Sequence, residues 1–262
     1  MDPFSDQELY PQYDRMFLDH FKGLFDSVFV GFFPFFKIQD FNASDYRKSL
    51  EISLEDARNQ DEVFRNITAT NATIYTRNTN YPSEKEISTK GTIVTWAVVR
   101  KGAGFNSNSE LCKALKTSIG AYNLEFARPD LAKKLETFVK KAKLWVPGEG
   151  AFDVLTSLKI YHTFVSLGKK FIVIVDEHYQ TKRELNLNDL TAEEFTQEIG
   201  GKDYYIYSAD KSILFSVDWD SFFFLICSTS TLLKRIIESQ EFEGFFAGPM
   251  TTHGWEHEHL LP

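Results

Sequence analysis

The segment Tyr204–Ser228, with the sequence YYIYSADKSILFSVDWDSFFFLICS, constrains the fold more than any other part of the chain. Its β-branched and aromatic residues form three runs, at 204–207, 213–217 and 222–227, separated by turn-forming residues. This pattern predicts three consecutive β-strands, the last of them an aromatic core strand. The segment therefore indicates an α+β domain with a Phe-rich core, and it does not identify an activity.

The remainder of the chain predicts further strands at 92–99 and 171–176, which we expect to join the same sheet. Helices are predicted by apolar spacing and capping residues at 5–25, 42–59, 110–118, 129–144, 152–164, 191–199 and 229–239. An edge strand is expected at 242–246, and residues 78–90 look rich in turns. The expected architecture is a mostly antiparallel sheet covered by helices. We expect one domain over residues 1–262. The alternative is a division into halves at 1–145 and 146–250, with a flexible tail at 251–262.

Charge and composition exclude some classes of function. The chain has 262 residues, 29 basic and 37 acidic, and a formal net charge of −8. Nucleic-acid binding requires a clustered basic face, so we expect no nucleic-acid partner. Aromatic residues make up 15% of the chain, including 25 Phe, which provides for a large core. We therefore expect a globular protein whose partner, if it has one, is another protein. The oligomeric state stays open.

The cysteines and the apolar segments predict the location. Cys112 and Cys227 cannot form a disulfide framework and fit no zinc spacing, which favours a reducing compartment. The acidic start of the chain does not resemble a signal peptide. The apolar stretch at 27–36 is too short to cross a bilayer, which takes about 20 residues. We therefore expect a cytoplasmic protein without a transmembrane segment.

Asp218 and Asp220 form the first candidate site. Residues two apart in a strand point to the same face, and two carboxylates can bind a divalent metal or raise one another's pKa. Trp219 would then point into the core. The alternative is that these aspartates cap backbone N–H groups in a turn.

The run FIVIVDEH at 171–178 provides a second candidate group. It resembles the acidic strand end of a Walker-B hydrolase, but the phosphate-binding loop required upstream is missing. Since sites often lie at strand ends, Asp176, Glu177 and His178 remain candidates, with His178 a partner for the aspartates. Glu149, between two glycines, could reach a ligand or serve the N-terminus of the next helix.

The end of the chain, HGWEHEH at 253–259, has the densest set of metal-binding side chains. His253 and His257 have the spacing of one helix face, and His257 and His259 that of a strand face. Zinc requires three or four ligands on a fixed scaffold, and we expect this tail to be mobile. These three histidines are therefore a candidate metal site, and Trp255 indicates that part of the tail docks onto the body.

The C-terminal third, from the strand–DWD–aromatic-strand segment to FEGFF at 242–246, resembles a bacterial family of unknown function. The resemblance implies a soluble bacterial protein and supplies no activity. The same order of small strands and a helix is similar to that of some bacterial immunity proteins, which bind and neutralise a toxin.

Two functions follow as hypotheses, and whether the protein is an enzyme stays open. The first is a non-enzymatic, immunity-like module that binds another protein. The second is a metal-dependent hydrolase that uses Asp218 and Asp220, with His178 or the tail histidines. Because no set of residues has the completeness that catalysis requires, the binding hypothesis ranks first.

Overall fold

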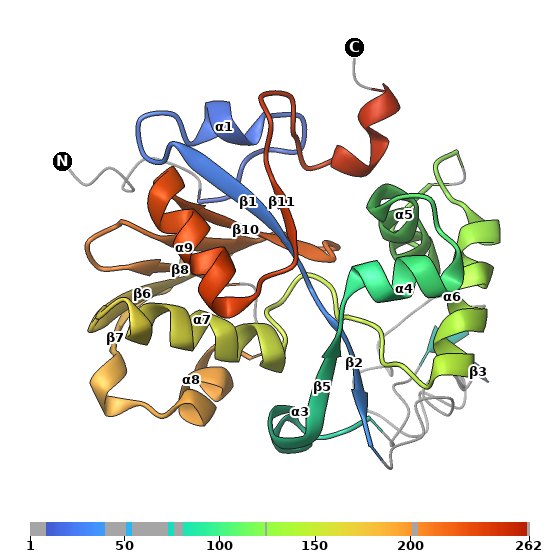
Figure 1. Cartoon of the computed structure of the whole chain (residues 1–262), viewed down its shortest axis with the longest axis horizontal. Helices are drawn as coiled ribbons and strands as arrows, with labels where there is room; N and C mark the ends of the chain where they lie inside the picture. Colours follow the sequence, from blue (N-terminus) through green and yellow to red (C-terminus); the bar gives the residue numbers. More distant parts are fainter. Residues whose placement is uncertain are drawn as a thin grey trace.

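A seven-stranded antiparallel sheet organises the chain (Figure 1). The computed structural model describes residues 9–39, 51–53, 73–75, 81–123, 125–200 and 204–260. The strand order is β11-β1-β10-β9-β8-β6-β7, and every neighbouring pair is antiparallel. These strands are β1 (Ser27–Phe32), β6 (Phe171–Asp176), β7 (Lys182–Asn186), β8 (Tyr204–Ser208), β9 (Leu214–Val217), β10 (Phe223–Ser228) and β11 (Gly244–Phe246). The predicted α+β class is therefore confirmed, as are the three strands of the 204–228 segment.

Alternating side chains of the sheet build a core on each face. Phe224 and Ile226 of β10 pack with α7 (Val154–Ser166), α8 (Ala192–Ile199) and α9 (Ser230–Gln240). Phe223, Leu225 and Cys227 of the same strand face the opposite layer. That layer contains α1 (Phe17–His20), α4 (Trp96–Ala103), α5 (Asn108–Ser118) and α6 (Pro129–Ala142). Because a strand alternates its side chains, a fully buried strand such as β10 serves both cores.

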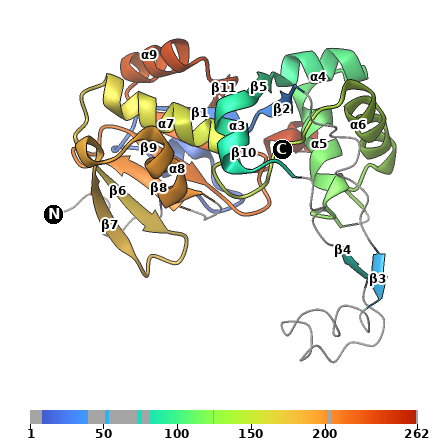
Figure 2. The ribbon, with the colours of Figure 1, turned by 90° about the horizontal axis from the view of Figure 1, so that it is seen from below.

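Smaller elements complete the described structure. The strand pair β2 (Phe35–Ile38) and β5 (Gly91–Val94) lies beside α3 (Glu84–Lys90), and β3 (Glu51–Ser53) pairs with β4 (Thr73–Tyr75). Figure 2 shows the β3–β4 pair projecting from the body. Two 3₁₀ helices, η3 (Leu187–Asp189) and η4 (Trp255–Leu260), occur in loops. No helix in the described ranges is long and apolar enough to cross a membrane.

The strand predicted at 92–99 is wrong in two ways. Its first part, β5, pairs with β2 instead of joining the large sheet. Its second part starts α4, because the Thr95 side chain accepts a hydrogen bond from Val98 N–H and the Glu243 carboxylate accepts from Trp96 and Ala97 N–H. These acceptors satisfy amides that open a helix and therefore favour a helix over a strand.

Three predictions near the N-terminus also need correction. The helix predicted at 5–25 is reduced to Phe17–His20 in the described residues, and its proposed cap at Ser5 lies outside them. Within the helix predicted at 42–59, the described residues Glu51–Ser53 form a strand, and the others lie outside the described ranges. The segment at 78–90 contains α3, which begins with a capping box between Ser83 and Glu86.

The tail predicted to be mobile is buried over its first part. Thr251, Thr252, His253, Trp255 and Glu256 are each at most 6% exposed. Trp255 packs against the rings of Phe32, Phe223 and Phe245, at centroid distances of 5.6, 5.8 and 5.0 Å. This C-terminal segment, defined here as residues 251–256, is thus an integral part of the layer that carries α5.

Candidate functional site

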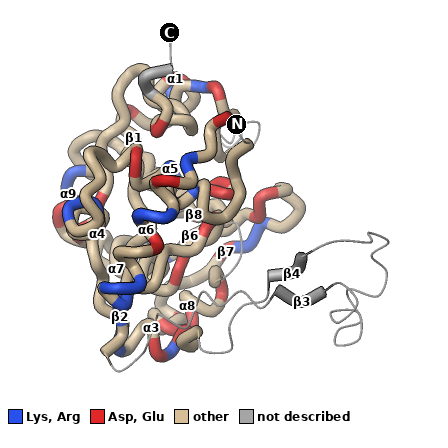
Figure 3. Tube along the Cα trace, turned by 90° about the vertical axis from the view of Figure 1, so that its right-hand side faces the viewer, with Lys and Arg blue, Asp and Glu red and all other residues tan. Residues whose placement is uncertain are grey.

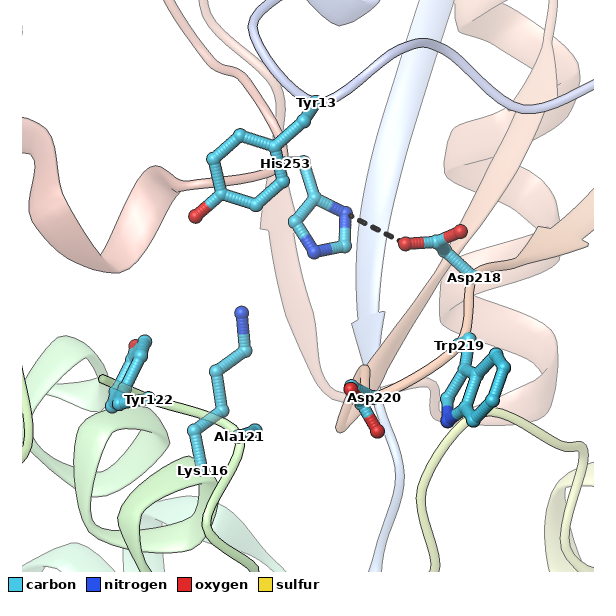
Figure 4. Close-up of a pocket in the computed structure, with 8 residues that line it drawn as sticks. All are labelled: Tyr13, Lys116, Ala121, Tyr122, Asp218, Trp219, Asp220 and His253. Atoms are coloured by element: carbon cyan, nitrogen blue, oxygen red, sulfur yellow. Dashed lines mark ion pairs between the residues drawn. The ribbon is translucent and has the colours of Figure 1, made fainter.

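A pocket lies where the C-terminal segment meets the end of α5 and the turn between β9 and β10 (Figure 4). Its cavity volume is about 340 Å³, within the range of small-molecule sites. It is lined by Tyr13, Lys116, Ala121, Tyr122, Asp218, Trp219, Asp220 and His253. Four separate segments of the chain therefore meet in one cavity.

The turn after β9 sets the directions of its three consecutive side chains. The strand ends at Val217, the Ser221 N–H donates to the Asp218 carbonyl at 3.3 Å, and Asp220 has a φ of 56°. Strand alternation therefore does not apply to Asp218 and Asp220. Figure 4 shows the Asp218 carboxylate directed toward His253 and the Asp220 carboxylate lying apart from it. The prediction that Trp219 enters the core is wrong, because its side chain is 67% exposed.

The carboxyl group of Asp218 has a raised pKa. Burial of its carboxyl raises its pKa to about 6, and the carboxylates of Asp220 and Glu177 act in the same direction. A hydrogen bond from Trp219 N–H and the charge of Lys116 partly oppose the shift. The side chain is still 44% exposed, so a molecule in the pocket can reach it. The Asp218 carboxylate also accepts a hydrogen bond from the backbone N–H of Trp219, as expected for an aspartate that caps a turn.

His253 is the buried polar group beside Asp218. Its Nδ1 lies 2.9 Å from the Tyr10 hydroxyl and 3.6 Å from Asp218 Oδ2. Its ring contacts those of Tyr13 and Phe223, at centroid distances of 4.8 and 5.2 Å. Burial, and then the charge of Lys116, lower its pKa to about 3. The imidazole is therefore neutral at pH 7, and its contact with Asp218 is a polar contact between an anion and a neutral ring.

A buried ion pair fixes the wall of the pocket opposite His253. Lys116 Nζ lies 2.6 Å from Glu256 Oε1, with the two side chains 4% and 0% exposed. The Tyr122 hydroxyl donates to the same oxygen at 2.7 Å. Burial would raise the pKa of Glu256, but Lys116 and Tyr122 outweigh it and hold that pKa below its usual value. The pair is thus charged at neutral pH and joins α5 to the C-terminal segment.

The structure brings together three of the predicted site residues, Asp218, Asp220 and His253. The predicted partner His178 is instead on the turn after β6, with its Nε2 3.1 Å from Glu177. In the same turn the Asp176 carboxylate accepts the N–H groups of His178 and Gln180, which is a turn-stabilising role.

The other candidates also lie away from the pocket lining. His257 packs on the rings of Tyr122 and Phe126, at 5.2 and 5.1 Å, and the side chain of His259 lies outside the described part. Glu149 is exposed, and the cap of α7 is Asp153, whose carboxylate accepts from Leu155 and Thr156 N–H. In the part of the chain that the structure describes, no three His, Cys, Asp or Glu side chains converge as metal ligands would. The metal-binding prediction thus gains no geometric support there.

Several lining residues escaped sequence reasoning, namely Tyr13, Lys116 and Tyr122, together with the supporting Tyr10 and Glu256. The position of Lys116 in the sequence contains a signal that could have identified it. Lys116 follows Cys112 by four residues and therefore lies on the buried face of α5, where an unpaired charge is costly. The tyrosines come from irregular segments, where no periodicity marks them.

The arrangement offers three chemical capacities. Asp218 can take or give a proton near neutral pH, as a general base does when its pKa approaches the working pH. His253 presents a neutral imidazole inside the cavity, and the rings of Tyr13, Tyr122 and Trp219 offer aromatic surface at its walls. Together these features are typical of a site for a small organic molecule.

Comparisons with known proteins place the chain among sequences without an assigned activity. It is 23% identical over 175 residues to the "Uncharacterized protein YwbB" of Bacillus subtilis (strain 168), an alignment covering 67% of this chain and 77% of that protein. No solved structure matches it. The family model described as "Protein of unknown function (DUF2711)" matches residues 14–257, far more than the C-terminal third that the sequence resemblance covered. The chain therefore belongs to this family of unknown function.

Proposed function

We propose that the pocket binds a small organic molecule and that Asp218 exchanges a proton with it. One observation carries the proposal: a partly exposed carboxyl, with a pKa of about 6, faces a cavity of small-molecule size. Perturbed carboxyl groups in clefts are concentrated at functional sites, because a proton acceptor is most effective when its pKa lies near the working pH. In this role Asp218 accepts a proton from the bound molecule and returns it later in the cycle.

The surroundings of Asp218 support this role. His253 is fixed by Tyr10, Tyr13 and Phe223, so the cavity wall that it forms is rigid. The Lys116–Glu256 pair fixes the opposite wall to the C-terminal segment. A site held by packed side chains keeps its geometry without reorganisation, which favours both binding and proton transfer.

A screen of small metabolites by saturation-transfer difference NMR tests the proposal, with wild-type protein and an Asp218→Asn variant in parallel. We expect at least one compound class to bind the wild type with an affinity that changes through a transition near pH 6. The variant should lack that transition, because its amide does not titrate. Absence of any binder, or identical pH profiles for the two proteins, would contradict the proposal.

An immunity-like protein-binding role is the second candidate. The exposed Trp219 favours it, because Trp is enriched among the residues that dominate binding energy at protein interfaces. The test is co-purification from a bacterial lysate with wild-type protein and a Trp219→Ala variant. A partner captured by the wild type and lost with the variant supports this role, whereas equal capture by both removes its only structural support.

The metal-dependent hydrolase hypothesis is tested by a thermal melt with EDTA and then with Zn²⁺, Mn²⁺, Mg²⁺ or Ca²⁺. A metal present at 100 times its Kd would add about 2.7 kcal/mol to the free energy of unfolding. A shift that disappears when Asp218 and Asp220 are replaced by Asn supports the hypothesis. The same melt in all conditions would eliminate it.

A further inference from the structure

The charges around the pocket do not cancel. Lys116 is the cation among the lining residues, and Glu256 neutralises it at 2.6 Å within a buried pair. The carboxylates of Asp218 and Asp220 remain, and no basic side chain within the described residues forms an ion pair with Asp220. The mouth of the pocket is therefore negative at neutral pH, which raises the local concentration of cations. Figure 3 shows that elsewhere basic and acidic residues are interspersed along the described chain.

His253 adds a hydrogen-bond acceptor that points into the cavity. The ring is 4% exposed, and Nδ1 faces Tyr10 and Asp218. Figure 4 shows the other nitrogen, Nε2, directed to the side of the pocket where Lys116 lies. The hydrogen bond and the ion-pair contact that His253 makes with described residues both involve Nδ1. We assign the ring proton to Nδ1, which then donates toward the Tyr10 oxygen and the Asp218 carboxylate, because the ammonium on the Nε2 side favours a lone pair there. Nε2 therefore offers a lone pair, which suits a ligand that donates a hydrogen bond.

Aromatic rings surround the same space. Tyr13 is 60% exposed and Trp219 is 67% exposed, and both line the pocket. The face of an aromatic ring attracts an organic cation, most strongly in the case of Trp. The pocket thus combines two carboxylates, a buried hydrogen-bond acceptor and exposed rings. All three features favour an organic cation that donates hydrogen bonds.

We propose that the ligand of this pocket is a small organic cation, a protonated amine that donates hydrogen bonds to Asp218 and to Nε2 of His253 while its apolar part contacts Trp219 and Tyr13. This inference rests on the proposed function, since it names the class of molecule that the site takes. Cation binding requires an ionised Asp218, so acid should weaken it.

The pH dependence follows from the groups that face Asp218. These are Tyr10, His253, Lys116, Asp220, Glu177 and Tyr205. The pKa of Tyr10 and that of Tyr205 are raised by burial, His253 is neutral above its pKa of about 3, and Lys116 stays charged. The titration near pH 6 therefore belongs to Asp218, and protonation removes the charge that attracts the cation.

Three probes of equal size and different charge test the inference: benzylamine, benzyl alcohol and benzoate. Saturation-transfer difference NMR measures the affinity of each for the full-length protein. We expect benzylamine to bind at least about tenfold more tightly than the other two, the effect of one charged contact. From pH 8 to pH 5 its affinity should fall about tenfold, since Asp218 is about 90% protonated one unit below its pKa.

Two variants assign the effect to the pocket. Asp218→Asn should lower benzylamine affinity about tenfold and remove its pH dependence. Glu193→Gln removes the same charge from an exposed position on α8, on the opposite face of the sheet, and should change nothing. A thermal melt of each variant verifies that it is folded.

Tighter binding of benzoate, equal binding of the three probes, or no binding at millimolar concentration would each overturn the cation inference. The small-molecule site itself falls only if the wider metabolite screen also gives no binder. A neutral or anionic compound found in that screen, competing at Asp218, would refute the cation class and leave the proposed function standing.

Discussion

Asp218 is a residue whose ionisation differs between the unfolded and the folded chain. Burial raises its pKa from 3.8 to about 6, so between these values the folded state binds more protons than the unfolded state. Stability therefore falls as pH rises through this window. We predict that the free energy of unfolding of Asp218→Asn, measured relative to that of the wild type, is about 1 kcal/mol higher at pH 8 than at pH 4. This value is discounted for solvent screening at a 44% exposed side chain.

Urea unfolding at the two pH values measures this difference. Asp220→Asn is the matched control: it makes the same chemical change two residues away, and Asn tolerates the positive φ of that position. The Asp220 carboxylate makes only a minor contribution to the pKa shift of Asp218, so its variant should stay close to the wild-type pH profile. If the pH profile of Asp218→Asn were parallel to that of the wild type, burial would not destabilise the ionised Asp218 carboxylate.

Glu256 illustrates the opposite case, a buried charge that is fully paired. Glu256→Gln leaves the Lys116 ammonium buried without its counter-charge, at a predicted cost of ~3–5 kcal/mol in the free energy of unfolding. Adding Lys116→Met should recover most of this loss, because the stranded charge is then absent. Chemical denaturation of the two single variants and the double variant tests the coupling.

The control for this pair lies on α6. Glu136→Gln removes the partner of Lys140, which is 48% exposed, and should cost no more than about 1 kcal/mol. If Glu256→Gln were equally mild, the buried pair would not be a determinant of stability.

At the residue scale, sequence reasoning named three of the eight residues that line the pocket, Asp218, Asp220 and His253. Asp218 and His253 were found because carboxylates at a strand end and histidines near a chain end are visible as residue types. Their association was missed, since it depends on the C-terminal segment lying next to the β9–β10 turn, which is distant in sequence. Lys116 was missed because its burial can be inferred only once it is known that the face of α5 that carries it is buried.

At the scale of elements, the C-terminal segment should be indispensable. Trp255 is 4% exposed and packs among three aromatic rings, so Trp255→Ala should cost ~3–5 kcal/mol by removing buried surface and leaving a cavity. Trp219→Ala is the matched control. Its side chain is 67% exposed, so the same replacement should change the free energy of unfolding by no more than about 0.5 kcal/mol. Urea titration of both variants decides, and equal costs would mean that the segment is not docked.

Local signals predicted the elements that depend on local interactions. The capping box from Thr191 to Glu194 identified α8, and Pro129 in the first turn identified α6. The strands of 204–228 follow from their apolar runs. The start of α4 could not be predicted in this way, because two of its first three N–H groups donate to Glu243, which is distant in sequence. The Val-rich composition then favoured a strand that the tertiary structure overrides.

At the scale of the whole molecule, the question is whether the helical layer and the sheet unfold together. The chain is long enough for two domains, and the alternative division at residues 145 and 146 would separate α4–α6 from most of the sheet. The C-terminal segment links the two parts. Trp255 packs on strand residues, while the Ser109 hydroxyl donates to the Glu256 carbonyl and Lys116 pairs with its carboxylate. Strand β1 adds a second link, because it leads directly toward β2 beside α3.

We therefore predict one cooperative thermal transition, with calorimetric and van't Hoff enthalpies that agree. The buried contacts between the layers couple their stabilities. Unfolding of one layer alone would expose Trp255 and separate Lys116 from Glu256, leaving each charge without its partner. Differential scanning calorimetry measures both enthalpies. In Glu256→Gln the coupling is weakened, and the transition should broaden or split, with the α5-containing layer melting first. Two resolved transitions in the wild type would instead support two domains, and the pocket would then lie at an interface between independently folding halves.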